Sequence, residues 1–183
     1  MSIARRLLLT ACLGLVVLGY EDVLAQARVR VEGTEAMVRV VADIGVNVNR
    51  DLAWRVLTDY NRWPDFVPDL LVSRVVSRQG DTVRLEQRAR FPALPNLPLV
   101  MILDVTQTPP SVVRLRRVAG NVRGLVGEWQ VQGKGPVRLI YRANVEPGFP
   151  VPPELSLDLF RAEARTRLEA MAKEMVRQAA APE

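Results

Sequence analysis

Histidine is absent from this sequence of 183 residues, and cysteine occurs once, as Cys12. Without an imidazole, neither a Ser-His-Asp triad nor a Cys-His pair can form, so the common hydrolase arrangements are excluded. A zinc site built from histidine or from several cysteines is excluded too, and one cysteine cannot form an intrachain disulfide bond. We see no metal-ligand motif and no glycine-rich phosphate loop, so we predict no metal and no cofactor.

The N-terminal apolar run is too short to span a membrane comfortably. Residues 7–19 carry no charge and number 13, whereas a transmembrane helix needs about 20 apolar residues. Two arginines at positions 5–6 precede this run, and residues 25–27 (Ala-Gln-Ala) form a small-x-small cleavage site, which together are typical of a secretory signal peptide. We therefore expect cleavage near Ala27 and a periplasmic or secreted chain that begins at Arg28.

Two alternatives to a cleaved signal peptide stay open. Residues 9–12 (LTAC) resemble a lipobox, which would place a lipid on Cys12. This alternative is disfavoured, because only three apolar residues precede Thr10 and the apolar run continues past the cysteine. Retention of the segment as an uncleaved anchor is disfavoured by its length.

The charge balance is basic, with 25 Lys and Arg against 20 Asp and Glu and a net charge of +5. A positive excess favours anionic surfaces, so we expect transient contact with an anionic membrane surface. Nucleic acid is disfavoured as a partner, because of the predicted compartment and because no basic run is longer than Arg116-Arg117. No linker is visible after the signal peptide, so residues 28–183 are predicted to form a single domain.

The remaining sequence predicts one strand, two short helical segments, six further strands and a long helix. Residues 36–48 form the first strand, Asn49 caps the first helix, and a helical turn lies between Pro64 and Pro68. A proline-rich loop is expected across residues 92–98. The six further strands are predicted at 71–78, 82–91, 99–106, 111–119, 124–132 and 137–145, and the long helix runs from Pro153 to about Gln178.

Alternation along these strands predicts a sheet with one dry face and one wet face. Val83, Leu85 and Ala89 face the dry side together with Gln87, whose polar group needs a partner there. The long helix carries one apolar stripe, while Glu163 and Arg167 are expected as an i,i+4 pair on its wet side. The stripe consists of Leu157, Phe160, Ala164, Leu168, Met171 and Met175.

These elements predict an α+β fold in which a curved, seven-stranded antiparallel sheet wraps around the C-terminal helix. A sheet closed over a helix leaves an apolar space between the two, which suits a small apolar ligand. Four segments are similar to the START-like (SRPBCC) superfamily, which has the helix-grip fold. They are AWRVLTDYNRWPDFVPDL (53–70), RLEQRARF (84–91), GEWQV (127–131) and RLIYRANVEPGFPVPPEL (138–155).

Within this superfamily, the chain most resembles the bacterial polyketide cyclase/dehydrase and coenzyme-Q-binding group. The resemblance implies a cavity between sheet and helix that holds a lipid, quinone, sterol or polyketide, and many members have no known activity. The side chains that we expect to contact such a ligand are Trp63, Phe66, Gln87, Trp129, Tyr141, Phe160, Ala164, Leu168 and Met171.

Each candidate residue also has a purely structural interpretation. Trp63 and Phe66 could plug the core beneath the short helices, and Trp129 and Tyr141 could be ordinary core side chains. Asp59 is predicted to close the first helix through backbone hydrogen bonds rather than to act in catalysis.

The sequence therefore favours an exported, non-catalytic binding or carrier protein for an apolar small molecule, and we assign no catalytic residue. One alternative is a cyclase or dehydratase acting on a polyketide-like substrate. Such an enzyme would need an acid or base in the cavity from among Asp, Glu, Tyr, Arg and Lys. The other alternative is a protein-interaction module whose cavity is vestigial.

Overall fold

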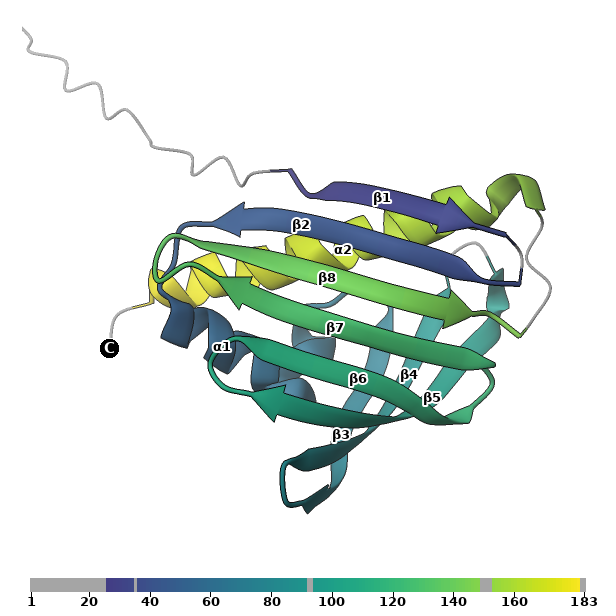
Figure 1. The fold of residues 1–183 in the computed structure, drawn as a ribbon, viewed down its shortest axis with the longest axis horizontal. Coiled ribbons are helices and arrows are strands. Elements are labelled where there is room, and N and C mark those ends of the chain that lie inside the picture. The colour runs from purple at the N-terminus through teal and green to yellow at the C-terminus, as the bar shows by residue number, and fades with distance from the viewer. Residues whose placement is uncertain (1–25, 35, 92–93, 149–152, 182–183) are drawn as a thin grey trace, which may run out of the picture.

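A computed structural model describes residues 26–34, 36–91, 94–148 and 153–181 of the chain (Figure 1). Almost all of the predicted signal peptide, including Cys12, lies outside the described residues. The core of the molecule is formed by one antiparallel sheet and the long helix α2, which runs across one face of the sheet.

The sheet has eight strands in the order β1-β2-β8-β7-β6-β5-β4-β3. Strands that follow one another in the chain are neighbours in the sheet, except that β2 pairs with β8 and not with β3. The strands are β1 (Arg28–Gly33), β2 (Val38–Val46), β3 (Leu70–Gln79), β4 (Thr82–Phe91), β5 (Leu94–Thr108), β6 (Val112–Gly120), β7 (Gly124–Gln132) and β8 (Val137–Glu146).

The predicted α+β class and antiparallel sheet are confirmed, but the predicted number of seven strands is wrong. The missed strand is β1, a six-residue edge strand in which Val31 is the one buried residue. Its sequence, RVRVEG, has too few apolar positions to show alternation clearly. The predicted loop at 92–98 is also wrong from residue 94 onward, because β5 begins at Leu94 and pairs back to Phe91 of β4.

Three helical segments complete the fold. The first and the last lie where they are predicted, whereas the turn predicted between Pro64 and Pro68 begins earlier, at Tyr60. The helix α1 (Arg50–Thr58) begins as predicted, since the side chain of Asn49 accepts a hydrogen bond from the Leu52 amide at 2.8 Å. It is followed by the 3-10 helix η1 (Tyr60–Asp65) and, after β8, by α2 (Pro153–Ala179). No helix in the described ranges is both long enough and apolar enough to cross a membrane.

The core lies between the inner face of the sheet and α2. The alternation predicted for β2 and β4 is confirmed, because Val40, Ile44 and Leu85 are almost fully buried. From α2, Leu168, Met171 and Met175 are completely enclosed. Helix α2 packs mainly on β1 and β2, at one end of the sheet, and contacts α1 beside it. The strands farther along the sheet are therefore less tightly covered, and the cavities lie under them.

A cavity between the sheet and the C-terminal helix

The larger interior cavity has a volume of about 80 Å³ and lies between α2 and the inner face of the sheet. Apolar side chains form most of its wall. On the sheet side these are Val40 on β2, Met101 on β5, Leu125 on β7 and Val145 on β8, and on the helix side Phe160 and Ala164. The sheet and the helix therefore both contribute to the wall, as the sequence predicts for a helix-grip cavity.

A second cavity of about 30 Å³ adjoins the first, deeper beneath η1. Four residues line both cavities, namely Met101, Leu125, Tyr141 and Arg167, so these side chains form the partition between the two spaces. For comparison, an empty apolar cavity that admits benzene measures about 150 Å³. A larger ligand can therefore enter only if the partition side chains move.

Six of the nine predicted ligand-binding residues line these two cavities. Trp63, Gln87 and Trp129 line the smaller cavity, Phe160 and Ala164 line the larger, and Tyr141 lines both. The structure places the other three elsewhere. Leu168 and Met171 are enclosed in the core, and Phe66 packs against the core with a partly buried side chain.

The aromatic residues around the smaller cavity contact one another. The ring of Trp129 lies tilted against that of Tyr141 at a centroid distance of 4.5 Å, and Trp63 meets Trp129 edge-on at 6.3 Å. Tyr60 in turn lies edge-on to Trp63. Such edge-to-face and offset pairs stabilise a fixed wall. The aromatic cluster thus combines the structural role and the cavity-lining role that the sequence left open.

The position of two polar residues differs from the prediction. Glu163 and Arg167 form the predicted i,i+4 ion pair, but both line the larger cavity instead of lying on the wet side of the helix. The helical spacing contains the signal, because residues three and four apart share a face. Position 163 is three residues after Phe160, and position 167 is three residues after Ala164.

Arg167 also reaches the Tyr141 hydroxyl, so three polar groups meet in an otherwise apolar wall. Burial raises the pKa of Tyr141, which keeps the phenol neutral. Burial lowers the pKa of Arg167, but the attraction of Glu163 and the contact with Tyr141 outweigh it and raise the pKa overall. Neutral phenol and charged guanidinium are therefore the stable forms of these groups in the cavity.

Trp63, which lines the smaller cavity, has a buried indole Nε1 that finds no partner among the described residues. The other polar groups nearby are satisfied. Gln87 donates to the Ser73 hydroxyl at 3.2 Å, and Gln107 donates to the Tyr60 hydroxyl at 2.7 Å. An unpaired buried donor costs free energy, and a ligand acceptor in this cavity would satisfy it.

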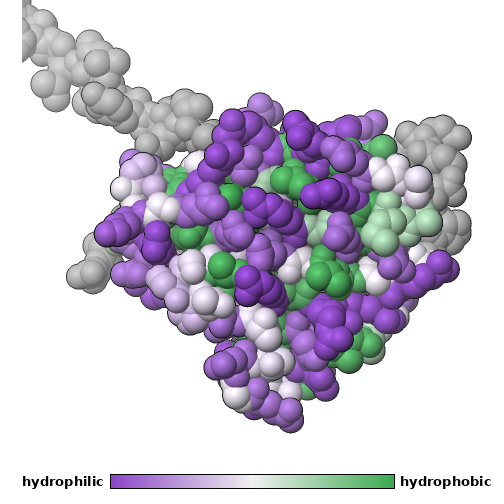
Figure 2. Space-filling model, viewed as in Figure 1, coloured by the Kyte–Doolittle hydropathy of each residue, from purple (hydrophilic) through white to green (hydrophobic). Residues whose placement is uncertain are grey.

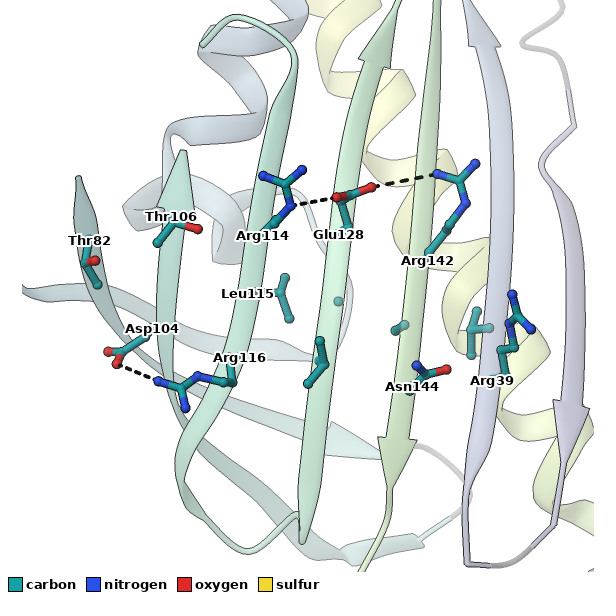
Figure 3. Close-up of a pocket in the computed structure, with 14 residues that line it drawn as sticks. Arg39, Thr82, Asp104, Thr106, Arg114, Leu115, Arg116, Glu128, Arg142 and Asn144 are labelled. Carbon is teal, nitrogen blue, oxygen red and sulfur yellow. Dashed lines mark ion pairs between the residues drawn. The ribbon is translucent and has the colours of Figure 1, made fainter. Parts of the chain in front are cut away.

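A third feature lies outside the core, on the face of the sheet that points away from α2. Here a groove of about 780 Å³ runs across β2, β8, β7, β6, β5 and β4 (Figure 3). Its sides are two rows of polar residues, one containing Arg114, Glu128 and Arg142 and the other containing Asp104 and Arg116. In the part of the chain that the structure describes, no group of three acidic or cysteine side chains is placed to bind a metal ion.

An antiparallel sheet closed over one long helix, with an apolar cavity between them, defines a helix-grip protein of the START-like class. The family described as polyketide cyclase/dehydrase and lipid transport matches residues 46–172, and the chain belongs to it. A search of curated proteins gave no match.

Three solved structures illustrate the similarity of fold. An aromatase/cyclase, Zhui, from a Streptomyces species superposes with a TM-score of 0.68 at 16% identity, covering 79% of this chain and 97% of its own. A STAR-related lipid transfer protein from Xanthomonas axonopodis gives 0.65 at 18% identity, covering 82% and 92%. A START superfamily protein from Mycobacterium smegmatis gives 0.65 at 14% identity, covering 76% and 98%. At these identities, the similarity shows the fold alone.

Proposed function

We propose that this protein binds or carries an apolar small molecule, a lipid, quinone or polyketide-like compound, in the space between the sheet and α2. The observation that carries the proposal is the apolar cavity, lined from both sides and containing hydrogen-bond donors at Tyr141, Arg167 and Trp63. Donors in an apolar pocket orient a ligand that bears an acceptor such as a carbonyl group. The family's description, which includes lipid transport, supports the same proposal.

The electrostatics of the cavity favour binding over catalysis. An acid or base for catalysis at neutral pH needs a pKa near the working pH. The pKa values of Tyr141 and Arg167 are both raised, which takes each group further from neutrality. The carboxylate of Glu163 favours a second candidate, a cyclase or dehydratase, because it is an acidic group on the cavity wall. Its ion pair with Arg167 opposes that role, because the carboxylate is already engaged by the guanidinium group.

Binding is tested by native mass spectrometry of the protein purified from its own cell envelope, followed by organic extraction. We expect one co-purifying apolar compound. An Ala164→Leu variant, which fills the larger cavity, should lose it, whereas Ala119→Leu on the exposed end of β6 should keep it. Retention by the folded Ala164→Leu variant would contradict the proposal. Loss of the compound together with capture of one stoichiometric protein would favour the interaction module instead.

The enzyme alternative is tested with the extracted compound. An enzyme would convert it, and Glu163→Gln would abolish conversion while leaving binding intact. A carrier releases the compound unchanged, and Glu163→Gln alters only its affinity.

We further propose that the protein acts after export, with cleavage near Ala27. One feature supports this: the strand β1 begins at Arg28, so cleavage leaves the whole sheet in the mature chain. The cut removes Ala27, which is buried against the core and whose amide donates to Glu169. N-terminal sequencing of protein from a periplasmic fraction should give Arg28 as the first residue. An N-terminus at Met1, or a lipid on Cys12, would contradict the proposal.

A further inference from the structure

The outer face of the sheet carries a large surplus of arginine. Four carboxylates on this face, those of Asp43, Glu86, Asp104 and Glu128, are each shared by two arginines. Eight arginines therefore compensate only four negative charges, while the net charge of the entire chain is +5. Figure 2 shows the part of this face formed by β2, β8 and β7 as mostly hydrophilic, with small hydrophobic patches. Most of the chain's positive excess is thus concentrated on one surface.

Within that surface, three weakly compensated arginines line the groove. Arg84 and Arg114 take the short contacts to Asp104 and Glu128, at 2.8 and 2.9 Å. The second arginine on each carboxylate, Arg116 or Arg142, lies 4.0 Å away. Arg39 lines the same groove and forms no ion pair within the described ranges. Three guanidinium groups therefore keep donors free for an external anion.

The strand register arranges these arginines along the groove. Arg116 on β6, Val126 on β7, Asn144 on β8 and Arg39 on β2 lie side by side in neighbouring strands. Adjacent strands are about 4.8 Å apart, so Arg116 and Arg39 mark a line of about 14 Å. Arg142 belongs to the next outward-facing row, about 6.6 Å along the strands. Val126 lies between Arg116 and Arg39 in the first row and is 57% exposed, so the groove combines cationic groups with an exposed aliphatic side chain.

We propose that this groove and its arginines Arg39, Arg116 and Arg142 form a docking surface for a membrane rich in anionic phospholipid. Guanidinium groups bind phosphate oxygens in a bidentate manner and are weakly hydrated, which suits them to a headgroup layer. The exposed Val126 adds apolar contact with the same layer. Nucleic acid fits the surface less well, because the described outward-facing positions of the strands carry no aromatic side chain on which a base could stack.

The proposal does not depend on a ligand in the interior, because the groove lies on the opposite face of the sheet from the cavities. The groove assigns the membrane attraction expected from the net positive charge to one place on the surface. If net charge alone attracted the protein to membranes, every exposed cation would contribute equally. If the groove is the docking surface, Arg39, Arg116 and Arg142 contribute far more than cations outside the groove.

The test is co-sedimentation of the mature chain with lipid vesicles. Vesicles of phosphatidylcholine with about 30% phosphatidylglycerol should bind the protein in about 0.05 M salt, and vesicles of phosphatidylcholine alone should not. Binding should disappear in about 0.5 M salt because the charges are screened. The variant with Arg39→Gln, Arg116→Gln and Arg142→Gln should bind the anionic vesicles at least about tenfold more weakly.

The matched control removes three positive charges elsewhere, with Arg55→Gln, Arg78→Gln and Lys173→Gln at exposed positions outside the groove. This control should stay within about twofold of the unsubstituted protein, since its charges lie outside the proposed contact. Equal weakening of both triple variants would overturn the proposal in favour of net charge. Tighter binding to duplex DNA or polyglutamate than to the anionic vesicles would overturn it in favour of another polyanion. Thermal unfolding of each variant shows whether it is folded.

Discussion

Tyr60 and Tyr141 are the two tyrosines of the chain from Arg28 onward, and both hydroxyls lie inside the molecule. Tyr60 accepts a hydrogen bond from Gln107, and Tyr141 contacts Arg167. Burial raises the pKa of Tyr60 from 10.0 to about 12 and raises that of Tyr141 as well, against weaker opposing effects of their polar neighbours. Both phenols are therefore hydrogen-bond donors or acceptors in the folded state, and neither is an acid at physiological pH.

This environment predicts the alkaline behaviour of the folded protein. In the chain that begins at Arg28, we expect no tyrosine to ionise near pH 10, and ultraviolet difference absorbance measures this directly. The unfolded chain ionises near pH 10, so the stabilisation by neutral Tyr60 is complete below that value. It is lost as the pH rises toward about 12. A phenolate signal near pH 10 in the folded protein would show that a tyrosine is exposed.

At the scale of the element, the start of α1 depends on one side chain. The Asn49 oxygen accepts from the Leu52 amide, which satisfies one of the free amides of the first helical turn. We expect Asn49→Ala to lower the free energy of unfolding by about 1 kcal/mol, measured by urea denaturation. Asn49→Asp keeps an acceptor at the same place and should recover most of the loss. Equal losses in both variants would mean that the cap does not stabilise the helix.

The pair between Glu163 and Arg167 is the corresponding feature of α2. Each side chain is 23% exposed, and the pair lies at the cavity wall. Removing one partner leaves a poorly solvated charge without compensation. We therefore expect the losses from Glu163→Gln and Arg167→Met to be non-additive, with a coupling of about 1 kcal/mol in a double-mutant cycle of urea denaturation. Additive losses of the free energy of unfolding would mean that the two charges do not interact, as expected for a pair exposed to solvent.

For α2, the sequence predicts the apolar stripe but not the position of the charged pair. The apolar stripe containing Phe160 and Ala164 follows from spacing alone, and so does the fact that positions 163 and 167 share its face. Because charged residues are usually solvated, the sequence predicts Glu163 and Arg167 on the wet side. In the structure they lie at the edge of the stripe, facing the sheet. Tyr141 on the sheet supplies a polar partner for Arg167 there. Such a partner comes from a distant strand, and no local pattern reveals it.

The strands give the complementary case. Alternation predicts the inner face of β4 correctly, including buried Gln87, because each inward position contacts the core directly. The edge strand β1 escapes prediction because its stability comes from pairing with β2 and from contact with α2, rather than from its own apolar residues. The outer groove escapes prediction for a similar reason. Its arginines come from different strands, and only the register places them in one line.

At the scale of the whole molecule, the ion pairs of the outer face make the fold sensitive to acid. Hydrogen bonds from Arg74 and Arg84 hold the pKa values of Glu86 and Asp104 below their ordinary values of 4.5 and 3.8, against a smaller effect of desolvation. On α2, the hydrogen bond from Arg177 lowers the pKa of Glu174 in the same way. Each carboxylate therefore stabilises the folded state above its ordinary pKa, and that contribution is lost as the pH falls through the lowered value.

Protonation also removes the negative charges that separate the arginines of the outer face, so like charges repel more strongly as the pH falls. We expect the Tm to decrease steeply below pH 4.5, and to decrease less in about 0.5 M salt, because screening weakens the repulsion between exposed charges. A variant with Glu86→Gln and Asp104→Asn should have a lower Tm at neutral pH and a shallower decrease in acid. Differential scanning calorimetry across the pH range measures both. A Tm that is constant below pH 4.5, or a variant as steep as the unsubstituted protein, would show that the arginine surplus does not destabilise the fold.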